Sequence, residues 1–128
     1  MNKILIADDQ LGWRNFNEQS VVSVLGTDVI IHKAESAKEA YSMLLENAKE
    51  PYDYIFTDMQ MENDFTPKMA GEWLIEQIQN IPSYYKTTVI IVSASPKIKY
   101  IADSFGVNYI PKPVAGLSLE PYKEILVC

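Results

Sequence analysis

Five short apolar runs restrict the fold of this chain more than any other feature of its sequence. Most of them are continuously apolar and rich in Ile, Val and Tyr, and they cover residues 3–7, 29–33, 52–57, 88–93 and 107–110. Strands that are buried on both faces of a parallel sheet have this pattern, whereas half-exposed strands alternate apolar and polar residues. The runs therefore predict five strands of one parallel sheet.

The segments between these runs have the spacing of amphipathic helices. The clearest apolar stripe follows Ser36 and Glu39, which form a capping box, and comprises Ala37, Ala40, Tyr41, Leu44, Leu45 and Ala48. Further helices are predicted near residues 11–25, 74–81, 98–105 and 119–126, with Gly106 just past the end of the fourth helix. Five strands and five helices in alternation predict a doubly wound α/β sheet, because right-handed crossovers place helices on both faces.

The composition is that of one ordinary globular domain. With 128 residues, 48% of them hydrophobic and 22% charged, and with no linker or repeat, the chain is expected to form a single domain over residues 1–128. The single cysteine, Cys128, excludes an internal disulfide and a cysteine metal site and favours a cytoplasmic location.

Membranes and nucleic acids are not expected as partners. Asp8 and Asp9 interrupt the first apolar run too early for a signal sequence, and no run reaches the roughly 20 apolar residues of a membrane span. A net charge of −6 with scattered basic residues argues against direct binding of nucleic acid.

Polar residues stand where four of the predicted strands end. Asp8 and Asp9 end the first strand, Asp58 ends the third and Ser93 the fourth, while Lys112 follows the fifth. Ligands of open parallel sheets bind beyond the carboxyl ends of the strands, so we expect these side chains to gather at one edge. Close carboxylates repel one another unless a cation neutralises them. The cluster therefore predicts a site for a hard divalent cation, with Mg²⁺ as the natural candidate.

The same cluster predicts phosphoryl chemistry. Magnesium commonly takes one or two carboxylates together with water and phosphate oxygens, which leaves a third carboxylate to act as a nucleophile, and we assign that role to Asp58. Phosphoryl transfer needs mainly positioning and charge neutralisation, which the cation and Lys112 supply, while Ser93 is expected to hydrogen-bond the transferred group.

Each of these residues also has a structural interpretation when it is taken alone. The acidic pair is a common helix cap, Asp58 a turn residue, Lys112 a surface lysine and Ser93 a cap for the next helix. Their coincidence at one sheet edge favours the functional interpretation. His32 has no second histidine to share a metal, and Trp13 and Trp73 are interpreted as core or partly covered surface anchors.

At these positions the chain resembles the receiver domains of two-component response regulators. The resemblance covers essentially the whole chain and rests on four motifs in order: Asp8-Asp9, Phe-Thr-Asp58-Met-Gln-Met, Val-Ser93-Ala94 and Tyr109-Ile-Pro-Lys112-Pro113. It implies a flavodoxin-like sheet with strand order 2-1-3-4-5.

The resemblance also implies a role for each matched residue. Asp9 and Asp58 are expected to bind Mg²⁺ directly, Asp8 through water and Gln60 through its backbone carbonyl. The residues expected to contact the phosphoryl group or to act as the switch are Ser93, Ala94, Tyr109 and Lys112. The peptide bond between Lys112 and Pro113 is expected to be cis.

The implied function is a signalling switch that accepts a phosphoryl group from a histidine kinase or phosphotransfer protein and catalyses only its own phosphorylation and dephosphorylation. Its output is expected on the fourth helix, fifth strand and fifth helix, where a homodimer is also expected to form. The alternative is a pseudo-receiver that binds proteins without phosphorylation, against which the intact cluster argues. A third class of function, an enzyme on a similar fold, is disfavoured by these residues. Haloacid-dehalogenase-like phosphatases place a second aspartate where Gln60 stands, and flavodoxins place a phosphate loop where Asp8 and Asp9 stand.

Two departures from the family pattern concern loops. Pro67 and Gly71 lie nine and thirteen residues after Asp58, and their family counterparts lie about four and eight, so we infer an insertion of about five residues. The loop at 59–67 is expected to be mobile and to lie over the site. Pro111 directly before Lys112 removes a backbone donor and stiffens the approach to the lysine.

Overall fold

The computed structural model describes residues 1–61 and 70–126 of the chain. Its strands are β1 (Asn2–Ala7), β2 (Val29–Ala34), β3 (Tyr54–Thr57), β4 (Thr88–Ser93) and β5 (Asn108–Pro111). Its helices are α1 (Leu11–Leu25), α2 (Ala37–Glu46), α3 (Ala70–Asn80), the 3-10 helix η1 (Pro82–Tyr84), α4 (Ile98–Phe105), α5 (Lys112–Ala115) and α6 (Glu120–Leu126).

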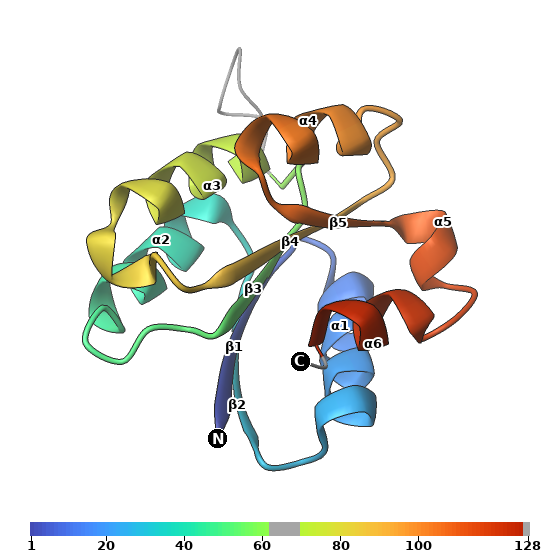
Figure 1. Cartoon of the computed structure of the whole chain (residues 1–128), viewed down its shortest axis with the longest axis horizontal. Coiled ribbons are helices and arrows are strands. Elements are labelled where there is room, and N and C mark those ends of the chain that lie inside the picture. The colour runs from blue at the N-terminus through green and yellow to red at the C-terminus, as the bar shows by residue number, and fades with distance from the viewer. Residues whose placement is uncertain (62–69, 127–128) are drawn as a thin grey trace.

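The five strands form one parallel sheet in the order β2-β1-β3-β4-β5, which confirms the predicted flavodoxin-like fold. Helices α1 and α6 lie on one side of the sheet and α2 and α3 on the other (Figure 1). Side chains of each central strand alternate between these two layers. Ile4 and Ile6 pack toward α1 and α6, whereas Leu5 packs toward α2 and α3. Both faces are therefore apolar, which explains the continuous apolar runs.

The structure has two short helices that the sequence did not predict, η1 and α5. Each has a proline in its first turn, where the missing N–H removes no helical hydrogen bond. Neither is long enough to develop an apolar stripe. The third strand is shorter than predicted, because it begins at Tyr54, and Tyr52 is buried just before it.

Helix ends follow the predicted capping signals where those signals are strong. The Ser36 hydroxyl accepts a hydrogen bond from the backbone N–H of Glu39 at 3.1 Å, and Gly106 ends α4 in the left-handed conformation with φ of 69°. Over the described ranges 1–61 and 70–126, the helices are too short or too polar to cross a bilayer.

Candidate functional site

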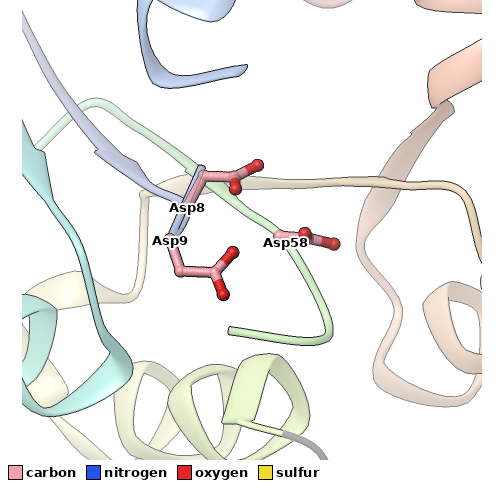
Figure 2. Close-up of side chains that lie close together, drawn as sticks. All are labelled: Asp8, Asp9 and Asp58. Carbon is pink, nitrogen blue, oxygen red and sulfur yellow. The ribbon is translucent and has the colours of Figure 1, made fainter. Parts of the chain in front are cut away.

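The carboxyl ends of β1 and β3 bring Asp8 and Asp58 together. Ala7 and Thr57 are partners in the sheet, so the residues that follow them leave neighbouring strands at the same level. The backbone N–H of Asp58 donates to the carbonyl of Ala7 at 3.0 Å and extends this pairing by one residue. Figure 2 shows the carboxylates of Asp8, Asp9 and Asp58 side by side, and one oxygen of each lies within 4.8 Å of the others.

Lys112 joins this cluster from the end of β5. Its Nζ lies 3.1 Å from Asp58 Oδ2, to which it donates a hydrogen bond, and 3.4 Å from Asp8 Oδ2. The lysine side chain is 10% exposed, so this ion pair is largely shielded from water. Three carboxylates and one ammonium give the cluster a net negative charge.

The pKa of Asp8 is shifted by its burial and by its charged and polar neighbours. Burial raises the pKa of Asp8 and the charge of Asp58 raises it further, while the Gln10 backbone N–H and the Lys112 ammonium oppose the rise. Asp8 Oδ1 accepts a hydrogen bond from that N–H at 2.9 Å. Asp8 Oδ2 is buried and accepts no hydrogen bond from the described residues. A buried oxygen of this kind, in a set of oxygen ligands, fits a hard divalent cation.

Asp58 is held firmly by its own backbone surroundings. Its Oδ1 accepts a hydrogen bond from the N–H of Met59 at 2.7 Å, and the Thr57 hydroxyl donates to its carbonyl at 2.8 Å. The Gly71 N–H donates to the Met59 carbonyl at 3.0 Å, which seats the start of α3 on the end of β3. A Cβ on Gly71 would lie 2.1 Å from the Asp58 carbonyl oxygen, so only glycine fits there. Sequence reasoning noted the spacing of this glycine and missed its contact.

Ser93 and Tyr109 lie on the two strands next to this site. Ser93 ends β4 opposite Pro111, the residue before Lys112, and its buried hydroxyl accepts a hydrogen bond from the N–H of Ser95 at 3.1 Å. Tyr109 pairs with Ile91 and packs, half-buried, against the α2, α3 and α4 layer. Tyr109 is therefore near the site without belonging to the acidic cluster.

Other predicted residues lie at the rim. Gln60 and Ala94 are exposed directly after Met59 and Ser93, and Pro113 is exposed in the first turn of α5. The cis form of the bond between Lys112 and Pro113 stays a prediction. The predicted mobile loop at 59–67 falls mostly on residues 62–69, which lie outside the described residues.

Two residues of α1 contact the site and were not predicted to do so. The buried guanidinium of Arg14 donates to the backbone carbonyl of Asp8 at 2.7 Å and lies 3.4 Å from Glu35. The Trp13 ring lies under the Lys112 ammonium, with 4.8 Å from Nζ to the ring centroid. Their position in the first helical turn after the acidic pair was the signal that could have found them.

His32 has the structural role that was expected of it. Its Nδ1 lies 2.6 Å from the hydroxyl of the buried Tyr52, and Asn47 Nδ2 donates to the same hydroxyl at 3.0 Å.

Comparison with known proteins gives a family and a set of similar structures. The family model described as response regulator receiver domain matches residues 4–120. No curated protein matches the sequence.

Among solved structures, the chemotaxis protein CheY4 of Vibrio cholerae is 20% identical, with a TM-score of 0.73 over 98% of this chain and 96% of that one. The receiver domain of the histidine kinase CKI1 from Arabidopsis thaliana is 22% identical, with a TM-score of 0.74 over 99% and 91%. The phosphorylated cyanobacterial phytochrome response regulator RcpA is 20% identical, with a TM-score of 0.75 over 97% and 90%. At these identities the likeness shows the fold.

Proposed function

This chain belongs to the response regulator receiver domain family, whose members are regulatory domains of two-component signalling, and we propose on that basis that it is a phosphorylation-dependent switch with Asp58 as its phosphoacceptor. The observation that carries the proposal is the pairing of Asp58 Oδ2 with Lys112 Nζ at 3.1 Å, beside two further carboxylates. A purely structural aspartate has no need of this unbalanced surrounding charge. RcpA, which shares the fold, has been solved in phosphorylated form.

Asp58 is the best placed of the three acidic residues to act as the nucleophile. It is buried, its carboxylate is oriented by the Met59 N–H, and it accepts a hydrogen bond from Lys112. In the proposed reaction, a carboxylate oxygen of Asp58 forms a bond to phosphorus while the phosphorus–nitrogen bond of a phosphohistidine breaks. The donor is a histidine kinase or a phosphotransfer protein, and its imidazole keeps the electron pair of the broken bond and takes up a proton.

Magnesium is the cofactor that the carboxylates fit. Asp9 and Asp58 would bind it directly, Asp8 through water, and Gln60 through its backbone carbonyl. The buried Oδ2 of Asp8, which lies 3.4 Å from Lys112 Nζ and accepts no hydrogen bond within the described ranges, supports this assignment. When bound, the ion would neutralise the charge of the phosphoryl oxygens.

Lys112 and Ser93 would stabilise the transferred group. The Lys112 ammonium already lies against Asp58, so it can pair with a phosphoryl oxygen after a small movement. The Ser93 hydroxyl accepts from a backbone N–H and keeps its own proton to donate. As this hydroxyl moves toward the phosphoryl group, the loop that begins at Ala94 shifts and Tyr109 turns inward, which biases a two-state element.

The output surface would comprise α4, β5 and α6, where a partner or a second copy of the domain binds. Tyr100 is 75% exposed on α4, and Lys99 and Asp103 form an exposed ion pair beside it. These side chains give the surface both an apolar and a charged component.

The proposal is tested by incubating the protein with acetyl phosphate and Mg²⁺ and measuring its intact mass. We expect the addition of one phosphoryl group, and none in Asp58→Asn or in Asp9→Ala. An adduct that persists in Asp58→Asn would refute the assignment of the phosphoacceptor. A wild-type chain that gains no mass would favour the alternative, a pseudo-receiver that binds its partners without phosphorylation.

A further inference from the structure

We infer that Trp13 is a positioning residue for phosphoryl transfer, which holds the Lys112 ammonium against its indole face while that ammonium moves from Asp58 to the phosphoryl oxygens. The inference rests on the proposed function of Asp58 and assigns a role to a side chain outside the acidic cluster. Its starting observation is the position of Lys112 Nζ over the Trp13 ring, at 4.8 Å from the centroid.

Among the described residues, the Lys112 ammonium contacts the Trp13 indole as well as two carboxylates. Lys112 Nζ lies 3.1 Å from Asp58 Oδ2 and 3.4 Å from Asp8 Oδ2, and the side chain is 10% exposed. An ammonium has three N–H donors and no acceptor, so a largely buried one needs a favourable contact on each side. The π face of Trp13 supplies such a contact in addition to those of the two carboxylates.

The Trp13 ring is itself held in place by aromatic packing. It lies edge to face with Phe16 at 5.1 Å, and Phe16 lies edge to face with Tyr122 at 6.3 Å. Tyr122 stacks at 5.9 Å on Phe56, which lies on β3 two residues before Asp58. A continuous row of four rings therefore connects the indole to β3, and the position of the indole is fixed relative to Asp58.

An indole suits this task better than a fourth carboxylate. Burial raises the pKa of Asp8 and the charge of Asp58 raises it further, and another negative charge would add to this repulsion. It would also hold the ammonium in one direction through a hydrogen bond. The quadrupole of an aromatic ring attracts a cation over its whole face and adds no net charge. Lys112 can therefore slide outward as charge moves from the Asp58 carboxylate to the phosphoryl oxygens.

Fluorinated tryptophans test this idea without changing the shape of the site. Trp73 packs against Tyr41 at 5.4 Å on the opposite side of the sheet, so Trp73→Phe leaves Trp13 as the only tryptophan. In that variant, each additional fluorine atom on the Trp13 indole weakens the attraction of its π face for the Lys112 ammonium. We expect the rate of phosphorylation by acetyl phosphate to fall steadily along the series, by roughly threefold to tenfold in total. Trp13→Phe should fall within this range, and Trp13→Leu should be the slowest.

The matched control carries the same fluorinated residues at Trp73 in a Trp13→Phe background. Its rates should be independent of fluorination, because Trp73 packs against Tyr41 in the opposite core layer and Lys112 Nζ lies over the ring of Trp13. Equal rates across the Trp13 series would overturn the inference, even if Trp13→Leu were slow, because loss of packing would then explain that variant.

A second measurement does not depend on phosphorylation. The ε-methylene protons of Lys112, identified with Lys112→Arg, should show an upfield ring-current shift in the resting protein that is lost in Trp13→Leu. Unshifted protons would overturn the inference. If the protons are shifted but neither the wild type nor any variant gains a phosphoryl group, the contact between Trp13 and Lys112 is confirmed. The proposed function and the role of Trp13 in phosphoryl transfer then both fail. If the whole fluorinated Trp13 series is phosphorylated at the same rate, the inference about Trp13 fails and the proposed function is unaffected.

Discussion

Replacing Gly71 with alanine should both destabilise the fold and disable the site. A Cβ at this position would lie 2.1 Å from the Asp58 carbonyl oxygen and 2.6 Å from the Met59 Cα. Ordinary contacts begin at 3.4 Å, so α3 and the end of β3 would have to separate by about 1.3 Å. Both contacts are to backbone atoms, which cannot rotate away as a flexible side chain can.

The expected cost follows from three contributions. Overpacking costs about 1–3 kcal/mol, and loss of the hydrogen bond from the Gly71 N–H to Met59 costs about 1 kcal/mol. The better helix propensity of alanine offsets somewhat less than 1 kcal/mol of this loss in stability. The net loss is about 1–3 kcal/mol, which at about 3–4 °C per kcal/mol lowers the melting temperature by roughly 3–12 °C. A displacement of about 1 Å at Asp58 should also slow phosphorylation by on the order of 100-fold.

Thermal unfolding and intact-mass kinetics measure these two effects. Gly12→Ala is the matched control, because a Cβ at Gly12 meets nothing within 4 Å and lies in the first turn of α1. That variant should be as stable as the wild type or more stable by up to about 1 kcal/mol. If Gly71→Ala melted with the wild type and were phosphorylated at the same rate, the close seating of α3 on β3 would be refuted.

Three further predictions concern single side chains. Because burial raises the pKa of Asp8 above its ordinary 3.8, the folded chain keeps a proton on Asp8 that the unfolded chain releases, so the contribution of Asp8 to stability without Mg²⁺ should fall as pH rises from 3.8 through the raised pKa of the folded state. Asp8→Asn should therefore raise the neutral-pH urea midpoint and have no advantage below pH 3.8; a lower midpoint at neutral pH would contradict this. Beryllofluoride with Mg²⁺ should shift the amide signals of Tyr109 and α4, and Ser93→Ala should confine the shifts to the acidic cluster; equal shifts in the variant would exclude Ser93 as the link. Tyr52→Phe should cost about 1–3 kcal/mol in urea unfolding, because it leaves His32 Nδ1 and Asn47 Nδ2 without the hydroxyl they share.

The sheet could be predicted from the sequence because each strand carries its own signal. Ile4 and Leu5 face opposite layers, so a buried parallel strand is apolar throughout and stands out without knowledge of its partners. Asp8, Asp58 and Lys112 could be predicted as neighbours for a similar reason, since carboxyl ends of parallel strands meet at one edge.

The rest depended on contacts that no local pattern contains. Helix α1 has only a weak stripe, because Arg14, Asn17 and Ser20 are buried and satisfied by particular hydrogen bonds. The role of Gly71 depends on the backbone of Asp58, and that of Trp13 on a lysine at the other end of the chain. Each required the folded arrangement before it could be recognised.

The hydrogen bond between Met59 and Gly71 makes the connection between β3 and α3 a natural place for engineering. It joins Met59 to Gly71, the residues on either side of 60–70. The end of β3 and the start of α3 are therefore held together whatever the length of the chain between them. Closing a flexible loop of twice the length costs only about 0.6 kcal/mol more. A reporter peptide or an epitope grafted between these two residues would therefore be carried beside Asp58 at little cost in stability.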